Sequence, residues 1–333
     1  MAEMDRMRVA QVGTRHGHAA GKLRAMLDSS EVEVVGVYEP DEAQRAKVAS
    51  AAPWNGIEWF ESMEGILADD SIVLVASEGA NIESLDQTEA LVNAGKHVWY
   101  DKPAGQNWEQ WQRVVAMARG QGTQLQMGYM FRYHEGFCQV ADWVRSGFLG
   151  DVYGLRAHMS TNVGEEQRHR VGVHPGGMFY DLASHMLDQI VWMLGRPVET
   201  TSFFRNHTGI VPEFMDNTVG VFEFEKALVV IDIAAMEVRP PARRFEVYGT
   251  QGSATITEPF EPATNIRLCL AAAAGGYVEG EQNVPVNPQS RQSLYELELA
   301  SLLGAIRGDH PPDRSLDHEL LVQETLIRIC GNL

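Results

Sequence analysis

The chain has 333 residues, of which 27 are Lys or Arg and 45 are Asp or Glu, so its formal net charge at pH 7 is −18. This acidic balance argues against nucleic-acid and anionic-membrane ligands, because proteins bind both through basic patches. The length exceeds what one hydrophobic core usually supports, so we expect two domains.

Targeting signals and disulfides are not indicated by the sequence. Residues 1–8 lack the apolar core of a signal peptide, and no uninterrupted apolar run is long enough for a transmembrane helix. The three cysteines, Cys138, Cys269 and Cys330, are far apart and show no C-x-x-C spacing. Reduced thiols fit this odd number, so we expect a cytoplasmic protein without a cysteine-based metal site.

The N-terminal stretch has the pattern of a dinucleotide site. An apolar strand at residues 8–12 ends in the turn Gly13-Thr14-Arg15-His16-Gly17-His18. A second strand, residues 32–38, ends at Glu39, about 20 residues after the turn, where an acid accepts ribose hydroxyls. Such a turn brings backbone amides close to a pyrophosphate. Because Arg15 and His18 occupy positions where G-x-G-x-x-G has glycine, an ordinary tight turn stays an alternative here.

Strands and helices alternate up to about residue 130. Helical patterns cover residues 41–52, 84–94 and 108–119, and strand patterns cover residues 72–76, 97–100 and 124–130. This alternation predicts parallel pairing through right-handed crossovers. The carboxyl ends of such strands line a ligand crevice, which places Gly13, Glu39, Glu78 and Lys102 on one rim. We therefore predict an α/β domain over residues 1–128, with the doubly wound parallel sheet of a Rossmann fold.

After residue 130 the strands follow one another with few helices between them. They are predicted at residues 152–161, 200–207, 218–224, 228–236, 244–248 and 254–257, with loops at 271–276 and 284–289 and closing helices at 293–306 and 317–329. Short turns between neighbouring strands indicate an antiparallel meander. We expect residues 129–333 to form an α+β substrate and oligomerisation domain with a large open sheet, one face of which another subunit covers.

A helical pattern over residues 178–194 contains no Lys, Arg or Glu, which indicates a buried helix. Asp181, His185, Asp188 and Trp192 fall on one narrow stripe of this helix. The stripe must face a partner or a cleft, because unpaired buried charges are costly. Asp181 can orient the imidazole of His185, which can exchange protons at neutral pH. The alternative is an internally satisfied Asp/His pair in the core.

Three blocks of sequence carry a family resemblance. They are Ala94-Gly95-Lys96-His97-Val98-Trp99-Tyr100-Asp101-Lys102-Pro103, then Gly176-Gly177 with Asp181, His185, Asp188 and Gly195, and then Glu246-Val247-Tyr248-Gly249-Thr250-Gln251-Gly252-Ser253. In this order the chain resembles the glucose-fructose oxidoreductase and inositol dehydrogenase family, also called Gfo/Idh/MocA. The resemblance implies an N-terminal nucleotide-binding domain, a C-terminal open sheet used for oligomerisation, and nicotinamide-dependent chemistry on sugars or polyols.

The resemblance also implies roles for single residues. Lys102 would lie beside the nicotinamide and the substrate hydroxyl, Asp181 would be the neighbouring carboxylate, and His185 would accept the proton. A base and a nearby cation suit this chemistry, because the hydroxyl loses its proton as the hydride leaves. The expected cofactor contacts are Gly13, Thr14, Arg15, His16, Gly17, Glu39, Ser77, Glu78, Asp101 and Lys102. The expected substrate contacts are Arg132, His174, Asp181 and His185, and no spacing specifies a metal site.

The chain departs from the family pattern in several places. Arg15 replaces the second glycine of the turn, Asp101 replaces the usual Glu, and residues 77–82 replace a T-P-N-x-x-H segment, with Glu78 as an added carboxylate. Glu39 favours NAD over NADP, because a carboxylate repels a 2′-phosphate, although Arg15 could partly compensate.

We therefore expect an NAD(P)-dependent oxidoreductase that moves a hydride between the nicotinamide and a secondary hydroxyl or ketone of a sugar, inositol or related polyol. A cytoplasmic homodimer or homotetramer is expected. Two alternatives stay open. One is a glycoside hydrolase or lyase that recycles NAD through transient oxidation and elimination. The other is a non-catalytic dinucleotide or sugar sensor, which the altered turn suggests and which Lys102, Asp181 and His185 argue against.

Overall fold

The computed structural model describes residues 6–256, 259–331 and 333, and its chain forms two compact units. The first unit contains the residues up to Met130 together with Arg291–Leu320, and the second contains Phe131–Ser290 and Leu321–Leu333. The predicted domains, residues 1–128 and 129–333, assign Arg291–Leu320 differently. That one domain binds the cofactor and the other binds the substrate stays a prediction.

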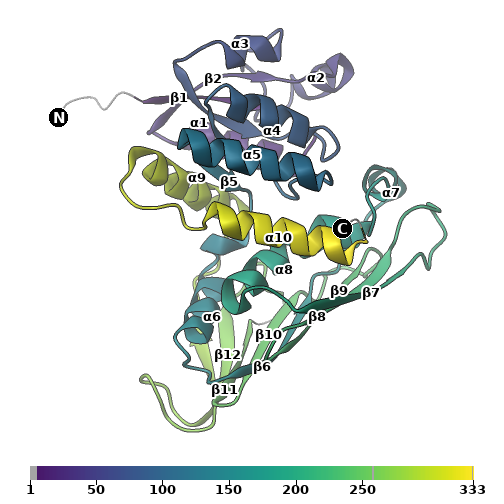
Figure 1. Ribbon diagram of the computed structural model, residues 1–333, viewed down its shortest axis with the longest axis vertical. Helices are drawn as coiled ribbons and strands as arrows, with labels where there is room; N and C mark the ends of the chain where they lie inside the picture. The colour runs from purple at the N-terminus through teal and green to yellow at the C-terminus, as the bar shows by residue number, and fades with distance from the viewer. Residues whose placement is uncertain (1–5, 257–258, 332) are drawn as a thin grey trace. The chain divides into compact units, whose positions relative to one another are not determined.

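The first unit is built on a parallel five-stranded sheet in the order β2-β1-β3-β4-β5 (Figure 1). The strands are β1 (Met7–Val12), β2 (Val32–Tyr38), β3 (Ile72–Ser77), β4 (His97–Tyr100) and β5 (Leu125–Met127). This order confirms the predicted doubly wound sheet. The topological switch point lies between β1 and β3, so the loops after these strands form the expected ligand crevice.

Helices cover this sheet. Five of the described ones come from the N-terminal part of the sequence, and the sixth, α9, comes from the C-terminal part. They are α1 (Ala19–Asp28), α2 (Glu42–Val48), α3 (Met63–Leu67), α4 (Ser84–Asn93), α5 (Trp108–Gln121) and α9 (Arg291–Arg307). Figure 1 shows α4 and α5 side by side. Helix α9 packs on α1 at Gly21, where a Cβ would lie 2.3 Å from the ring of Tyr295. The absence of a side chain at Gly21 therefore lets the two helices approach.

The second unit is built on an eight-stranded sheet in the order β13-β12-β11-β10-β6-β9-β8-β7, in which only β6 and β9 pair in parallel among the described strands. The strands are β6 (Val152–His158), β7 (Glu199–Arg205), β8 (Asn217–Glu223), β9 (Leu228–Ala234), β10 (Arg244–Gly249), β11 (Gly252–Ile256), β12 (Asn265–Leu270) and β13 (Gly280–Pro285). This topology confirms the predicted large, mostly antiparallel sheet.

One face of this sheet is covered by helices. They are α6 (Glu135–Arg145) and α8 (Met178–Leu194), which Figure 1 shows on the same side of the strands. A Cβ on Gly220 of β8 would lie 2.4 Å from the ring of Phe179 in α8, so helix and strand touch there. Val229, Ile231 and Ile233 of β9 are buried on this face. A 3-10 turn (Met130–Tyr133), α7 (Glu165–Gly172) and α10 (Leu316–Ile329) complete the described elements.

Some sequence-predicted bounds were wrong. The strand predicted at residues 124–130 ends at Met127, and the helix predicted at 41–52 ends at Val48. Strand β12 was not predicted, and β13 extends into the loop predicted at 284–289. Strand β13 is an edge strand whose mostly polar residues give no apolar alternation, which explains the error. Thr257, the last residue of the strand predicted at 254–257, lies outside the described residues.

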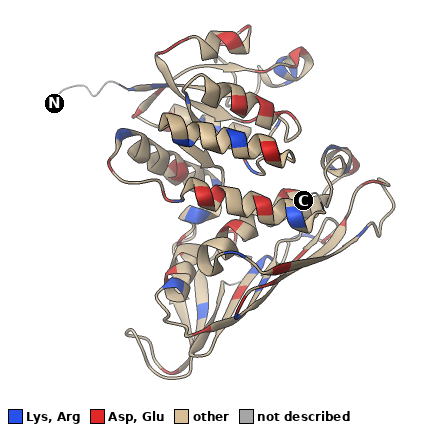
Figure 2. Cartoon of the chain, viewed as in Figure 1, with Lys and Arg blue, Asp and Glu red and all other residues tan. Residues whose placement is uncertain are grey.

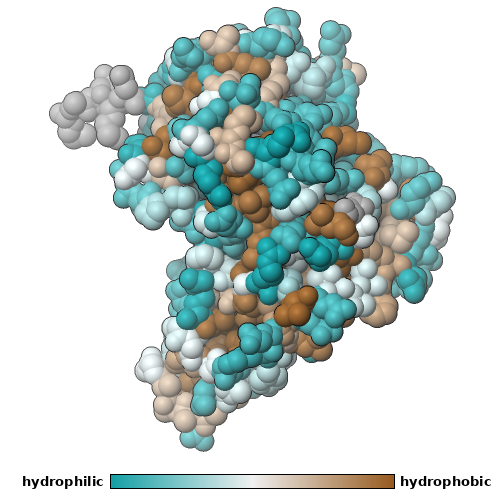
Figure 3. Space-filling model, viewed as in Figure 1, coloured by the Kyte–Doolittle hydropathy of each residue, from teal (hydrophilic) through white to brown (hydrophobic). Residues whose placement is uncertain are grey.

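Within the described residues, no helix has both the length and the apolar character that a membrane crossing requires. The face shown in Figure 3 carries hydrophobic residues in small groups among hydrophilic ones. Figure 2 shows Lys and Arg distributed among several elements rather than gathered on one.

The start of α8 depends on two glycines. Gly176 and Gly177 have φ values of +85° and +52°, and a Cβ on Gly177 would lie 2.6 Å from the carbonyl oxygen of Met215. The amide of Met178 donates to that same carbonyl at 3.2 Å. Only glycine allows this approach, so the first turn of α8 is fixed to the chain that leads into β8.

We predict that Gly177→Ala lowers the free energy of unfolding by about 2 to 4 kcal/mol, because it adds a steric clash to a strained φ. Gly195→Ala is the matched control, since Gly195 also has a positive φ but open space around it. It should cost about 1 kcal/mol. Urea unfolding of both variants measures the difference, and equal stabilities would contradict the clash.

Candidate active site

The turn after β1 is fixed to the loop after β3. Gly13 has a φ of +85°, and a Cβ there would lie 2.3 Å from the Gly79 nitrogen, so the two backbones touch. The amide of Glu78 donates to the Val12 carbonyl at 2.7 Å, and the amide of His16 donates to the Glu78 carbonyl at 3.0 Å. These contacts hold the predicted cofactor turn rigidly at the switch point of the sheet.

Glu39 lies at the end of β2, beside this turn, as the sequence pattern predicts. Its Oε2 accepts hydrogen bonds from the amide and the hydroxyl of Thr14, both at 2.8 Å, and its Oε1 accepts one from the Asp41 amide at 3.1 Å. Arg15 forms an ion pair with Asp41 and lies 3.8 Å from Glu83. Glu39 thus lies at the predicted position beside the turn, and the Arg15 guanidinium lies next to carboxylates. A contact of Glu39 with a ribose stays a prediction.

Five side chains form a buried charge cluster below the turn: His16, His18, Lys22, Glu78 and Asp101. The Nζ of Lys22 lies 2.8 Å from Glu78 Oε1 and 3.0 Å from Asp101 Oδ2. The Nδ1 atoms of His16 and His18 lie 3.2 and 3.0 Å from the same Asp101 oxygen. Lys22 and Glu78 are fully buried. The cluster joins the turn, α1, the loop after β3 and the end of β4.

The two histidines of the cluster have very different pKa values. Burial opposes the charged form of His16, but Asp101 and Glu78 outweigh burial and raise its pKa to about 9. Burial dominates at His18 and, with the neighbouring charges of His16 and Lys102, lowers its pKa to about 4 despite Asp101. Burial also raises the pKa of Glu78. At neutral pH, Lys22 and protonated His16 are therefore the cations that face the two carboxyl groups.

Three members of the cluster have the donor atoms of a metal site. His16, His18 and Asp101 offer ligand atoms that all lie within 4.8 Å of one another. However, the Lys22 ammonium already supplies positive charge at the Asp101 oxygen that both imidazoles approach. The oxygen that both imidazoles approach therefore already has a cationic partner, and the three donors form part of an ion-pair network.

Lys102 follows Asp101 of the cluster in the sequence, and its side chain is buried. Its amide donates to Asp101 Oδ1 at 2.7 Å, and its carbonyl oxygen lies 3.1 Å from His16 Nε2. Ser77, another predicted cofactor contact, is buried against α4, where its hydroxyl accepts a hydrogen bond from Thr88 at 2.9 Å. The predicted cofactor residues of the first unit thus surround the turn, with Ser77 directed towards α4.

The predicted substrate residues lie in the second unit, around α8. The ring of His174 stacks on that of Tyr180, with centroids 4.9 Å apart. Burial lowers the pKa of His174, and the charge of Asp181 opposes this shift. His185, one turn further along α8, is buried with its ring 5.2 Å from that of Phe131. The start of α8 therefore gathers two histidines and a carboxylate.

Arg132 has a carboxylate partner within the same unit. Its guanidinium donates to Asp188 Oδ1 from Nε at 3.0 Å and from Nη2 at 2.7 Å. Gln189 donates to the other oxygen of Asp188 at 2.9 Å. Both members of this ion pair are buried. Asp188, one residue of the polar stripe of α8, therefore forms an ion pair inside the second unit. A contact of Arg132 with substrate stays a prediction, as does joint action of Lys102 with His185.

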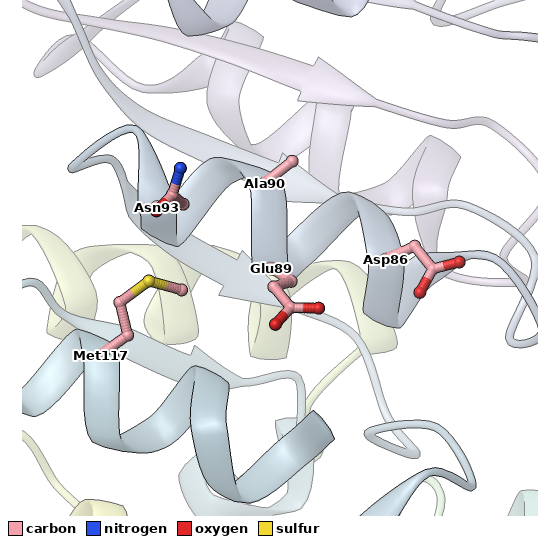
Figure 4. Close-up of a pocket in the computed structure, with 5 residues that line it drawn as sticks. All are labelled: Asp86, Glu89, Ala90, Asn93 and Met117. Atoms are coloured by element: carbon pink, nitrogen blue, oxygen red, sulfur yellow. The ribbon is translucent and has the colours of Figure 1, made fainter. Parts of the chain in front are cut away.

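Figure 4 shows a separate pocket between α4 and α5. It is lined by Asp86, Glu89, Ala90, Asn93 and Met117. None of these is a predicted site residue. Gln110 of α5 donates to Asp86 at 2.7 Å and to Glu89 at 2.8 Å, so these carboxylates link the two helices.

Sequence reasoning missed Lys22, which looks like any lysine of an amphipathic helix. A usable signal existed in the departures from the family pattern. His18, Glu78 and Asp101 each replace a different family residue, and the structure brings all three to the same cluster.

Comparison with known proteins matches both parts of the chain. Residues 7–129 match the model of an oxidoreductase family with an NAD-binding Rossmann fold, and residues 137–255 match that of a GFO/IDH/MocA C-terminal domain. Uncharacterized oxidoreductase YdgJ of Escherichia coli K12 is 24% identical over 322 residues, 92% of this chain and 90% of the relative. Inositol 2-dehydrogenase of Cereibacter sphaeroides ATCC 17029 is 27% identical over 267 residues, 77% of this chain and 73% of the relative.

Solved structures share the whole fold. The structure of GenD2 from gentamicin A biosynthesis in complex with NAD has a TM-score of 0.80 at 21% identity, covering 99% of this chain and 96% of GenD2. UDP-N-acetylglucosamine 3-dehydrogenase GnnA from Acidithiobacillus ferrooxidans has a TM-score of 0.78 at 18% identity, covering 99% of this chain and 98% of GnnA.

We predict that Lys22→Met lowers the free energy of unfolding by about 3 to 5 kcal/mol, because it removes one of the two cations that face the buried Asp101 and Glu78. Arg24→Met in the same helix removes only an exposed pair with Asp28 and should cost less than about 1 kcal/mol. Urea unfolding compares the two. A Lys22 variant as stable as the Arg24 variant would show that the cluster contributes no stability.

Proposed function

Because the chain belongs to the Gfo/Idh/MocA family of oxidoreductases, we propose that it transfers a hydride between NAD and a secondary hydroxyl or ketone of a sugar, inositol or related polyol. The observation that carries this proposal is the turn at Gly13 with Glu39 beside it, at the switch point of a sheet in a chain that matches the family in both parts. Relatives named as inositol 2-dehydrogenase and 1,5-anhydro-D-fructose reductase support the substrate class.

The residues present fit a dinucleotide. Gly13 brings the turn backbone to the switch point, α1 begins directly after the turn, and Glu39 offers a carboxylate to a ribose. Two features favour NAD over NADP. The Glu39 carboxylate would repel a 2′-phosphate, and the Arg15 guanidinium that could attract one is paired with Asp41. Bound NAD would accept the hydride from the carbinol carbon.

The chain's own residues would handle the proton. As the C–H bond gives up its hydride, the hydroxyl proton passes to His185, and the carbon–oxygen bond becomes a carbonyl. Lys102 would stabilise the negative charge that develops on that oxygen. Asp181 would hold the imidazolium that forms. In the reductive direction the same groups act in reverse.

A homodimer or homotetramer through the sheet of the second unit belongs to the same proposal. On the sheet face opposite α8, Phe203 and Leu228 are exposed, and Val219, Val221 and Val230 are partly exposed. Such an apolar face fits burial against a second copy. A cytoplasmic location is proposed from the acidic composition and from three cysteines that form no disulfide with one another.

We predict that Lys102→Met and His185→Asn each lower kcat at least about a hundredfold, because they remove the proposed cation and proton acceptor. Lys47→Met and His169→Asn are matched controls at exposed positions and should keep wild-type rates. NADH absorbance is followed while sugars and inositols are screened with NAD. Wild-type rates in both site variants would remove the assignment, and cleavage of a glycoside without net NADH would favour elimination chemistry.

We predict that Glu39→Ala raises the KM for NAD about tenfold and lowers the preference for NAD over NADP, since it removes both a ribose acceptor and a repulsive charge. Glu42→Ala, in the first turn of α2, is the control and should leave both constants unchanged. Steady-state kinetics with each cofactor measures the ratio. An unchanged ratio would mean that Glu39 serves only to hold Thr14.

A further inference from the structure

We infer that His16 and Asp101 are positioning residues that hold the peptide backbone of Lys102 from both sides. Asp101 Oδ1 accepts the Lys102 amide at 2.7 Å, and His16 Nε2 donates to the Lys102 carbonyl at 3.1 Å. Each peptide group is planar, so fixing its N–H or C=O fixes the whole group. The two contacts therefore orient the peptides before and after the Lys102 Cα, from which the ammonium side chain extends.

The two positioning side chains are themselves held. Asp101 lies within 3.2 Å of the side-chain nitrogens of His16, His18 and Lys22. The backbone amide of His16 is bound to the Glu78 carbonyl, and Glu78 pairs with Lys22. Movement of the His16 ring would therefore disturb several buried ionic contacts. A side chain held in this way can fix a neighbour to the precision that catalysis needs.

The contact with the Lys102 carbonyl requires a proton on His16 Nε2, because a carbonyl oxygen only accepts hydrogen bonds. The other ring nitrogen, Nδ1, lies 3.2 Å from Asp101 Oδ2 and accepts the His18 amide at the same distance when it is deprotonated. Asp101 and Glu78 raise the pKa of His16 against the effect of burial. The groups around them are Lys22 and His18, with Glu298 and Tyr295 of α9 next to these two. The hydrogen bond from His16 Nε2 to the Lys102 carbonyl can form whether Nδ1 is protonated or deprotonated.

This inference rests on the proposed function for its kinetic consequence, but the contact itself is testable without turnover. The matched variants are His16→Gln, whose terminal amide nitrogen can replace Nε2, and His16→Asn, whose shorter amide reaches only the Nδ1 position. Both remove the imidazolium from the cluster. The difference between them therefore isolates the contact with Lys102 from the loss of charge.

The experiment compares hydrogen exchange at the Lys102 amide and steady-state kinetics in the full-length protein. We expect slow exchange in the wild type and in His16→Gln, and at least tenfold faster exchange in His16→Asn. We expect kcat to be at least tenfold lower in His16→Asn than in His16→Gln, with the KM for NAD similar in both. Failure to find any NAD-dependent substrate would remove the proposed function but would leave the exchange result intact.

Three results would overturn the inference. The first is rapid exchange of the Lys102 amide in the wild type, a measurement that needs no variant to fold. The second is equal exchange and equal kcat in the two His16 variants. The third is stoichiometric zinc in the purified wild type, measured by elemental analysis and lost in both variants. That outcome would make His16, His18 and Asp101 metal ligands instead of an ion-pair network.

Discussion

The first unit depends on one ammonium group placed between two buried carboxyl groups. Lys22 contacts Glu78 and Asp101, which belong to loops that follow β3 and β4, while Lys22 itself comes from α1. Removing a charge from water costs several kcal/mol, and only close partners and hydrogen bonds offset that cost. Helix α1 and the loops after β3 and β4 therefore cannot separate without exposing an uncompensated charge.

The general architecture could be predicted because it follows from periodicity. Alternating strands and helices, then successive strands, indicated the two sheets, and Gly13 and Glu39 marked the switch point. Lys22 could not be predicted in the same way, because a lysine in an amphipathic helix reads as solvent-exposed until its buried partners are known. The return of Arg291–Leu320 to the first unit also has no local signal, since α9 packs through a contact between Gly21 and Tyr295 that are far apart in sequence.

The polar stripe of α8 shows a second limit of sequence reasoning. Periodicity assigns Asp181, His185 and Asp188 to one face of a helix, but it does not give the depth of each residue. In the structure Asp188 is used internally, in a buried pair with Arg132, whereas Asp181 is partly exposed near His174. The same stripe thus contains Asp188, which forms a buried ion pair, and the proposed catalytic residues Asp181 and His185. Only the packing of the folded chain shows which residue has which environment.

The altered turn and the cluster below it are best understood as one change. Glycines at positions 15 and 18 would place no side chain at either position, whereas here His18 enters the cluster and Arg15 pairs with Asp41. The buried, protonated imidazole of His16 needs anionic partners, and Asp101 and Glu78 supply them. Each residue is costly alone and favourable in the presence of the others, so substitutions at these positions act together rather than additively. A turn that lacks the usual glycines can therefore keep its backbone in place, because ionic contacts from three loops take over the task of fixing it.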